Sequence, residues 1–343
     1  MSALRIAVLG AGNWGTTIAM LARSAGHDVA LYTRDAGQRD AIVSEHRNPR
    51  ALPGITLPEG IAATTSLAEA LASAELVLVA IPSQSFRDVM RAAGPLLSPD
   101  QVLVHGTKGL ENGSNARMST IVEDETPIRQ LGVLAGPNIA PEIARGLPAA
   151  TVIASRFPRA IQLVRQALAS DRFMVFAADD VVGVELAGAL KNVVAIAAGM
   201  ADEMAVGDNA KAFLVTRGLS ELMRLARALG AEPATLTGLA GIGDLMVTCA
   251  SPHSRNHKVG VALARGEALA DVVANLGMVA EGVFASRSAR ALAEKTGIEM
   301  PLYAHIDRVL AGELTPTAAL SALMRLPSGR DTPGFLRPSN RPL

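Results

Sequence analysis

Two polar residues that could take part in chemistry, Lys191 and Asn192, lie inside a mostly apolar run, residues 181–200. Burial disfavours the charged form of a lysine and can lower its pKa toward neutrality, which suits a general acid or base. A lysine that reaches water from the edge of a core helix is the structural alternative. If the run is a helix, the positions three and four residues from Lys191 are small or aliphatic and leave room for a ligand; they are Ala187, Gly188, Val194 and Ala195.

Cationic and polar side chains elsewhere in the chain could bind an anionic group. Lys108 stands between glycines in the loop 106–109, and Ser254, Arg255 and Asn256 follow one another at an expected helix start. A hydroxyl, a guanidinium and an amide at a helix N-terminus offer a phosphate hydrogen-bond donors and a favourable dipole. An exposed loop lysine and an ordinary helix cap would show the same residues, and the sequence leaves both interpretations open.

The elements that would position these residues begin with a Gly-rich turn. Gly10, Gly12 and Gly15 follow an expected strand at residues 4–9 and precede an expected helix. In such a turn the first glycine allows a sharp bend, the second lets a pyrophosphate approach the backbone, and the third lets the helix pack on the strand. With a second strand expected at residues 27–32, the spacing is typical of a dinucleotide-binding βαβ unit.

The residues after the second strand bear on the choice of cofactor. An NAD site usually places an acid there to bind the ribose hydroxyls, but here Thr33 and Arg34 come first and Asp35 only after them. Arg34 could bind a 2′-phosphate through two parallel hydrogen bonds. The sequence therefore favours NADP(H), with NAD(H) as the alternative.

The remaining elements change in character along the chain. Loops rich in glycine, proline and polar residues follow three of the later strands, where ligands bind in an open parallel sheet. From residue 179 the pattern is helical, with a polar loop at 202–209 and a Gly-rich turn at 238–244. Strands are expected at 75–81, 102–105, 132–135, 150–154 and 173–177, helices at 210–229 and from about 259, 284 and 315, and the loops at 82–84, 106–109 and 136–138.

This pattern predicts an α/β protein with a Rossmann-type, doubly wound and mostly parallel sheet, followed by an all-α domain. We expect an NAD(P)-binding domain at residues 1–178, a helical substrate and catalytic domain at 179–328, and a flexible tail at 329–343, where proline and arginine are frequent.

Composition excludes several classes of protein. The 32 basic residues equal the 32 acidic residues in number, so overall charge suggests neither a nucleic-acid partner nor an anionic membrane surface. The run 181–200 is long enough to cross a bilayer, but Glu185, Lys191 and Asn192 lie within it, which favours a buried helix over a membrane span. The single Cys249 rules out an internal disulfide, and the chain runs directly into a strand without a signal peptide, so we expect a cytoplasmic protein.

Cys249, His253 and His257 recur every four residues, as metal ligands on one helix face would. Pro252 interrupts the helix that would align them, and no HExxH motif accompanies them. We therefore expect no metal site.

Seven ordered blocks resemble the bacterial-type NAD(P)-dependent glycerol-3-phosphate dehydrogenases over nearly the whole chain. They are GAGNWGTTIA from Gly10, GTKGLE from Gly106, AGPN from Ala135, LAGALKNVVAIAAGM from Leu186, GLAGIGDLMVTC from Gly238, SRNHKVG from Ser254 and VAEGV from Val279.

The resemblance implies reversible reduction of dihydroxyacetone phosphate to sn-glycerol 3-phosphate for phospholipid synthesis. It makes Lys191 the general acid/base, which protonates the carbonyl oxygen as hydride reaches the carbon. The substrate-binding positions implied are Lys108, Gly136, Asn138, Lys191, Asp244, Ser254, Arg255 and Asn256. With the Gly-rich turn (Gly10, Gly12 and Gly15), the cofactor-binding positions are Asn13, Trp14, Arg34, Lys108, Ala140, Arg255, Val279 and Glu281.

The chain departs from the family pattern at two positions. Asn138 stands where the family usually has a threonine, and Pro141 replaces a common lysine. A related dehydrogenase, such as a 6-phosphogluconate dehydrogenase or a ketopantoate reductase, is the nearest alternative function. A nucleotide-sensing module that has lost catalysis is a more distant one, because fold alone does not fix function. The apolar helical domain could also support a homodimer.

Overall fold

The computed structural model describes residues 2–251, 254–275 and 281–327. The predicted tail at 329–343 and the predicted cofactor position Val279 lie outside the described residues. Contacts divide the chain into a first unit, residues 1–111 and 116–181, and a second unit, residues 112–115 and 182–343.

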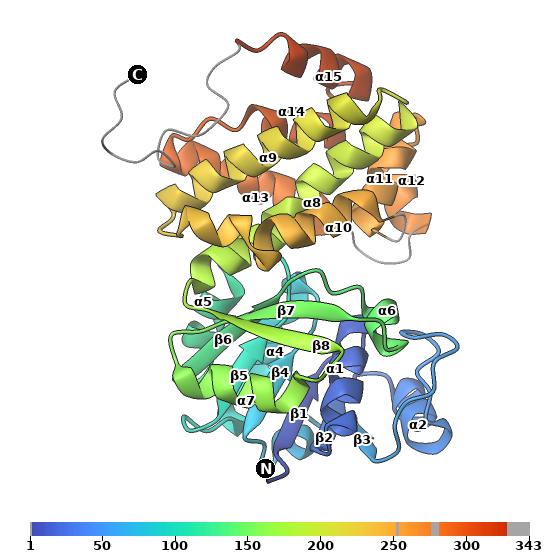
Figure 1. Ribbon diagram of the computed structural model, residues 1–343, viewed down its shortest axis with the longest axis vertical. Coiled ribbons are helices and arrows are strands. Elements are labelled where there is room, and N and C mark those ends of the chain that lie inside the picture. Colours follow the sequence, from blue (N-terminus) through green and yellow to red (C-terminus); the bar gives the residue numbers. More distant parts are fainter. Residues whose placement is uncertain (1, 252–253, 276–280, 328–343) are drawn as a thin grey trace. The chain divides into compact units, whose positions relative to one another are not determined.

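The first unit contains eight strands and seven α-helices among its described residues (Figure 1). The strands are β1 (Arg5–Leu9), β2 (Asp28–Tyr32), β3 (Ile61–Thr64), β4 (Leu76–Val79), β5 (Val102–His105), β6 (Gln130–Ala135), β7 (Ala149–Ala154) and β8 (Phe173–Ala178). The helices are α1 (Asn13–Ser24), α2 (Ala36–Glu45), α3 (Leu67–Leu71), α4 (Phe86–Ala93), α5 (Met118–Glu125), α6 (Ala140–Ala144) and α7 (Pro158–Leu168).

These strands form one sheet in the order β3-β2-β1-β4-β5-β6-β7-β8. Each neighbouring pair is parallel except β6 and β7. The first six strands have the order of a Rossmann fold, in which ligands bind beyond the carboxyl ends of the strands. The predicted fold class is confirmed, although the short strand β3 was not foreseen.

Both faces of the sheet are covered because alternate residues of its strands are apolar on both sides. Ile6 and Val8 of β1 pack in a core with α1 and α7, whereas Ala7 and Leu9 of the same strand pack in a second core with α3, α4 and α5. Burial on both sides fixes the strand ends from which the predicted site loops extend.

The second unit is helical in its described residues. Its helices are α8 (Val181–Glu203), α9 (Asp208–Ala228), α10 (Asp244–Ala250), α11 (Arg255–Ala264), α12 (Leu269–Asn275), α13 (Glu281–Thr296), α14 (Pro301–Leu310) and α15 (Pro316–Met324).

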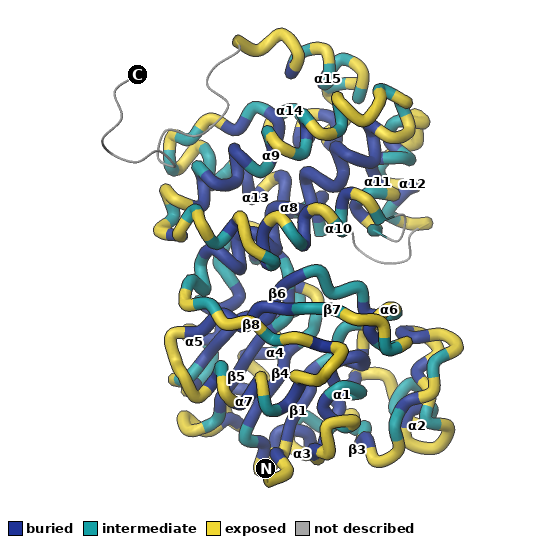
Figure 2. Tube along the Cα trace, viewed as in Figure 1, coloured by how far each residue is buried: buried dark blue, intermediate teal, exposed yellow. Residues whose placement is uncertain are grey.

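Helix α8, which carries Lys191, is the core helix of the second unit. It is long and apolar enough to cross a membrane, with a mean hydropathy of 1.7, but 89% of that apolar window is buried within the protein. In Figure 2 its trace is almost continuously buried. The prediction of a buried helix at residues 181–200 is therefore confirmed.

Glycines allow neighbouring helices to approach α8 closely. A Cβ on Gly260 of α11 would lie 2.0 Å from the Ile196 carbonyl oxygen, and one on Gly199 of α8 would lie 2.1 Å from the His257 carbonyl oxygen. Such contacts exclude any side chain, because real Cβ atoms do not approach so near. Further close approaches to α8 are made by Gly218 of α9 and Gly282 of α13.

One local prediction for this unit was wrong, and another was wrong in its bounds. The Gly-rich segment 238–244 is not an open turn: Leu239–Gly243 forms a π-helical turn that leads into α10. The polar loop expected at 202–209 is shorter than predicted: Asp202 and Glu203 end α8, residues 204–207 form the connection, and Asp208 begins α9. Glycine marks close packing as often as a chain reversal, so its presence alone did not distinguish the two.

A buried carboxylate joins α9 to α14. The carboxylate of Glu221 accepts hydrogen bonds from the Leu302 N–H, at 3.0 Å, and from the Tyr303 N–H, at 3.3 Å. It thereby caps α14, whose own N-cap residue makes no side-chain bond to another described residue. The Tyr303 hydroxyl in turn donates to the Leu190 carbonyl oxygen, at 3.3 Å, next to Lys191. Burial raises the pKa of Glu221 to about 7, against the opposing effect of the two N–H groups.

This raised pKa predicts a pH dependence of stability. Glu221 holds its proton to higher pH in the folded protein than in the unfolded chain. Its contribution to the unfolding free energy is therefore present at low pH and is lost as pH rises through about 7. Between pH 5 and pH 8 we expect the unfolding free energy of the wild type to fall by about 2 kcal/mol relative to Glu221→Gln. Urea denaturation at both pH values measures this. Glu203→Gln is the control, because Arg265 lowers the pKa of Glu203. An equal fall in unfolding free energy of the wild type relative to Glu203→Gln would contradict the assignment of this pH dependence to Glu221.

Candidate active site

The Gly-rich turn joins β1 to α1 and is built by close packing. Gly10 has a φ of 110°, and a Cβ there would lie 2.5 Å from the Ala80 carbonyl oxygen. A Cβ on Gly15 would lie 1.8 Å from the Gly10 carbonyl oxygen. These positions accept only glycine, because the first needs a left-handed backbone and the second has no space.

The N-terminus of α1 is available to an anion. No side chain among the described residues caps it, and Gly12 occupies the N-cap position. A Cβ on Gly12 would have no atom of the described chain within 4 Å, so the backbone is open on that side. The first N–H groups of a helix lack partners within the helix and attract negative charge. The turn therefore fits the pyrophosphate of a dinucleotide, with Asn13 and Trp14 in the first turn of the helix.

Trp14 also holds the turn against the rest of the unit. A Cβ on Gly106, at the end of β5, would lie 2.6 Å from the indole nitrogen of Trp14. The rings of Trp14 and Phe173 have centroids 6.4 Å apart. Ala140 of α6 is buried, and its carbonyl oxygen accepts a hydrogen bond from the Thr17 hydroxyl of α1 at 3.3 Å. This bond places Ala140 beside α1.

The loop after β2 separates the roles of Arg34 and Asp35. Arg34 is exposed. Asp35 caps α2 by accepting a hydrogen bond from the Gln38 N–H, and it pairs with Arg50 at 3.2 Å. The Gln38 N–H and, to a smaller extent, Arg50 hold the pKa of Asp35 below its usual value. Asp35 is thus occupied as a helix cap, and Arg34 is the side chain exposed beside it.

The structure brings Lys108 together with the loop after β6. The Lys108 ammonium donates to the Gly136 carbonyl oxygen at 3.2 Å. The Asn138 amide donates to the Thr151 hydroxyl at 2.9 Å, while its buried Oδ1 has no hydrogen-bond partner among the described residues. Pro141 is the second residue of the short helix α6, in the first turn, where proline is well tolerated.

Three contacts fix the loop that carries Lys108. The Thr107 hydroxyl donates to the Ile81 carbonyl oxygen at 2.8 Å, and the Gln84 amide donates to the Leu110 carbonyl oxygen at 2.9 Å. Arg87 of α4 makes two hydrogen bonds to Glu111, at 2.7 and 3.0 Å. Ends anchored in this way limit the positions that the Lys108 side chain can reach.

In the second unit, Lys191 forms a buried ion pair with Asp244. Their Nζ and Oδ1 atoms are 2.5 Å apart, and the two side chains are only 5% and 3% exposed. The ammonium also donates to the Thr248 hydroxyl and, at 3.3 Å, to the Asp244 carbonyl oxygen. Helix α10 therefore fills the space beside Lys191 that the small neighbours were expected to leave open.

The predicted anion-binding segment forms the start of α11. Ser254 is its N-cap and accepts a hydrogen bond from the His257 N–H at 3.3 Å, and Arg255 follows as an exposed first residue. Asn256 is buried, with its Oδ1 accepting from the Gly282 N–H at 2.9 Å. Glu281, adjacent to Gly282, begins α13, so this bond places it beside the start of α11.

Sequence reasoning missed Thr248 as a contact of Lys191. The sequence did contain a signal for this contact: Thr248 lies four residues after Asp244, which puts both side chains on one face of α10. It also missed that Asp244, expected to bind substrate, contacts the lysine.

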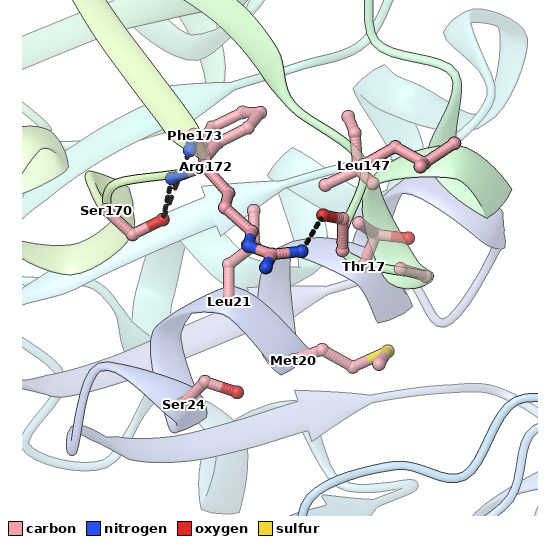
Figure 3. Close-up of a pocket in the computed structure, with 11 residues that line it drawn as sticks. Thr17, Met20, Leu21, Ser24, Leu147, Ser170, Arg172 and Phe173 are labelled. Carbon is pink, nitrogen blue, oxygen red and sulfur yellow. Dashed lines mark hydrogen bonds between the residues drawn. The ribbon is translucent and has the colours of Figure 1, made fainter.

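A separate cavity of about 210 Å³ lies in the first unit (Figure 3). It lies between α1 and the segments before β7 and β8, and mainly apolar side chains line it. The Arg172 guanidinium at its rim donates to the Gly146 carbonyl oxygen at 2.9 Å. Its lining includes none of the predicted site residues, so the candidate site rests on the Gly-rich turn and the strand ends instead.

A doubly wound sheet with an open Gly-rich turn, followed by a helical unit with a buried lysine, is an architecture typical of NAD(P)-dependent oxidoreductases. The chain matches the family models described as NAD-dependent glycerol-3-phosphate dehydrogenase N-terminus, over residues 5–160, and C-terminus, over residues 180–321. It belongs to this family.

Individual relatives agree with this assignment. The chain is 46% identical over 324 residues to glycerol-3-phosphate dehydrogenase [NAD(P)+] of Anaeromyxobacter dehalogenans, covering 94% of this chain and 98% of the relative. It is 43% identical over 321 residues to that of Xanthomonas campestris pv. campestris, covering 93% and 94%. The crystal structure of glycerol-3-phosphate dehydrogenase from Coxiella burnetii matches with a TM-score of 0.90 and 37% identity, over 94% of this chain and 99% of that one.

Proposed function

We propose that this chain catalyses the reversible NAD(P)H-dependent reduction of dihydroxyacetone phosphate to sn-glycerol 3-phosphate, which supplies glycerophospholipid synthesis. The observation that carries the proposal is the buried Lys191–Asp244 pair in a chain of this family. The first unit binds the dinucleotide and the second supplies the proton. We place the reaction in the cytoplasm, in keeping with the buried core helix α8 and the single cysteine, Cys249.

In this reaction the bound reduced nicotinamide supplies a hydride to the carbonyl carbon. Lys191 donates a proton from Nζ to the carbonyl oxygen, and in the reverse direction its neutral amine accepts the alcohol proton. The Asp244 carboxylate holds the ammonium in place, and the Thr248 hydroxyl restricts its direction. Because Lys191 and Asp244 are buried and Thr248 is half-buried, water competes little for the proton.

The phosphate of the substrate requires cationic and N–H donors. We assign these to Ser254, Arg255 and Asn256 at the start of α11, where the helix dipole also favours an anion. In the first unit we assign Lys108, which donates to the Gly136 carbonyl oxygen, to the substrate or the cofactor, and we assign the buried Oδ1 of Asn138 as an acceptor for a ligand hydroxyl. The amide at position 138 would thus replace the hydroxyl that is usual in the family.

We further propose that NADP(H) is preferred over NAD(H). Arg34 is exposed after β2, whereas the carboxylate that could bind ribose hydroxyls, Asp35, already caps α2 and pairs with Arg50. A guanidinium binds a phosphate through two parallel, charge-assisted hydrogen bonds.

The proposed reaction is tested by initial rates of NADPH and NADH oxidation with dihydroxyacetone phosphate, and with unphosphorylated dihydroxyacetone as control. Because a charged contact to phosphate adds roughly 1.5–3 kcal/mol, we expect kcat/KM to be at least about tenfold higher for the phosphorylated substrate. Equal or faster turnover of the unphosphorylated ketone would contradict the assignment, as would cofactor binding without any turnover.

The cofactor preference is tested by Arg34→Ala. We expect the Kd for NADPH to rise about tenfold or more, because one charge-assisted phosphate contact is lost, while the Kd for NADH changes little. Fluorescence titration of each dinucleotide measures this. Arg5→Ala, at the opposite end of the β1 strand, is the matched control. An unchanged ratio of the two Kd values in Arg34→Ala would refute the role of Arg34.

A further inference from the structure

A buried network of side-chain amides surrounds the Gly-rich turn. The Ala11 carbonyl oxygen accepts two hydrogen bonds, one from Asn48 Nδ2 at 3.0 Å and one from Gln38 Nε2 at 2.9 Å. Asn48 Nδ2 also donates to the Thr16 hydroxyl at 2.8 Å. Asn48 is fully buried, and it lies 37 residues from Ala11 in sequence. One side chain therefore binds both the turn and the first residues of α1.

The network fixes which atom of each amide faces the turn. Asn48 Oδ1 accepts from Gln38 Nε2 at 2.9 Å, and Gln38 Oε1 accepts from the Thr33 hydroxyl at 2.6 Å. Reversing either amide would place two oxygen atoms against each other, so the donors must point at Ala11. The Thr33 hydroxyl also accepts from the Asp35 N–H at 3.2 Å, which joins the loop of Arg34 to the same network.

The position of the Ala11 oxygen decides where the next N–H points. The Ala11 carbonyl and the Gly12 N–H belong to one planar trans peptide, so they point in opposite directions. Holding the carbonyl toward Asn48 and Gln38 directs the Gly12 N–H to the other side of the turn. A rotation of this peptide would instead present a carbonyl oxygen, which repels an anion.

We propose that Asn48 is a positioning residue for the cofactor: it holds the Ala11–Gly12 peptide so that the Gly12 N–H faces the dinucleotide pyrophosphate. This inference rests on the proposed dinucleotide site and adds to it a residue that need not touch the cofactor. Gln38 supports Asn48 in the same role. The network holds the start of α1 without using its N-terminal N–H groups, because Asn48 and Gln38 donate to a carbonyl and a hydroxyl oxygen.

The test is Asn48→Asp, which keeps the shape of the side chain but replaces the Nδ2 donor by an acceptor. Gln101→Glu is the matched control, since Gln101 Nε2 also donates to two backbone carbonyls, of Leu71 and Ala74. Gln101 directly precedes β5, at the amino end of that strand and thus away from the Gly-rich turn, which follows the carboxyl end of β1. Kd values for NADPH and NADH are measured without substrate. Inhibition by adenosine 2′-monophosphate, which has no pyrophosphate, and kcat at saturating NADPH are measured alongside.

For Asn48→Asp we expect both Kd values to rise about tenfold or more, because the charge-assisted hydrogen bond from the Gly12 N–H to the pyrophosphate is lost. The inhibition constant of adenosine 2′-monophosphate, kcat and all values for Gln101→Glu should stay near wild type. Unchanged Kd values for both dinucleotides in folded Asn48→Asp overturn the proposal. So does an equal rise of these Kd values in Gln101→Glu, or an equal weakening of adenosine 2′-monophosphate binding in Asn48→Asp. If Asn48→Asp does not fold, the half-buried Gln38→Glu decides by the same criteria. A wild type that binds neither dinucleotide overturns the cofactor site itself.

Discussion

The buried ion pair between Lys191 and Asp244 places the strictest demand on the second unit. A single charge removed from water is costly, and breaking such a pair by removing one partner typically costs about 3–5 kcal/mol, so the two side chains must stay in contact. That requires α8 and α10 to hold a fixed spacing. Other contacts keep α8 rigid. Gly199 and Gly260 bring α8 and α11 close together, and Glu221 caps α14 within the same unit. Lys191 is thus held by the packing of the whole unit.

The dinucleotide site that we propose for the first unit requires that α1 keep its N-terminal N–H groups available. An ordinary helix would use a Ser, Thr or Asp cap there, as α2 does with Asp35. Helix α1 has Gly12 instead, and its stability must come from elsewhere. The bonds of Asn48 to Ala11 and Thr16 provide it from a distant segment of the chain. Stability and ligand access are thereby assigned to different residues.

Local patterns in the sequence predicted the parallel sheet, because short apolar runs that end in polar, Gly- or Pro-containing loops and the spacing of Gly10, Gly12 and Gly15 are short-range properties. The buried helix around Lys191 followed from its apolar length. The partners of that lysine did not, since Asp244 and Thr248 lie 53 and 57 residues away and only tertiary packing brings them near. Asn48 was missed for the same reason. The segment 238–244 was wrongly predicted as a turn, because glycine has no side chain to show whether it bends the chain or permits close contact.

The central claim, that Lys191 is the proton donor, is tested most directly by single-turnover reduction of dihydroxyacetone phosphate by Lys191→Met/Asp244→Asn. The double substitution avoids leaving the Asp244 carboxylate buried without a partner. Lys211→Met/Asp202→Asn, which removes a more exposed ion pair of the same unit, is the matched control. For the Lys191 variant we expect at least a roughly hundredfold loss of rate with the Kd for NADPH unchanged, and for the control a rate close to wild type. A rate within a few-fold of wild type in the Lys191 variant would contradict it.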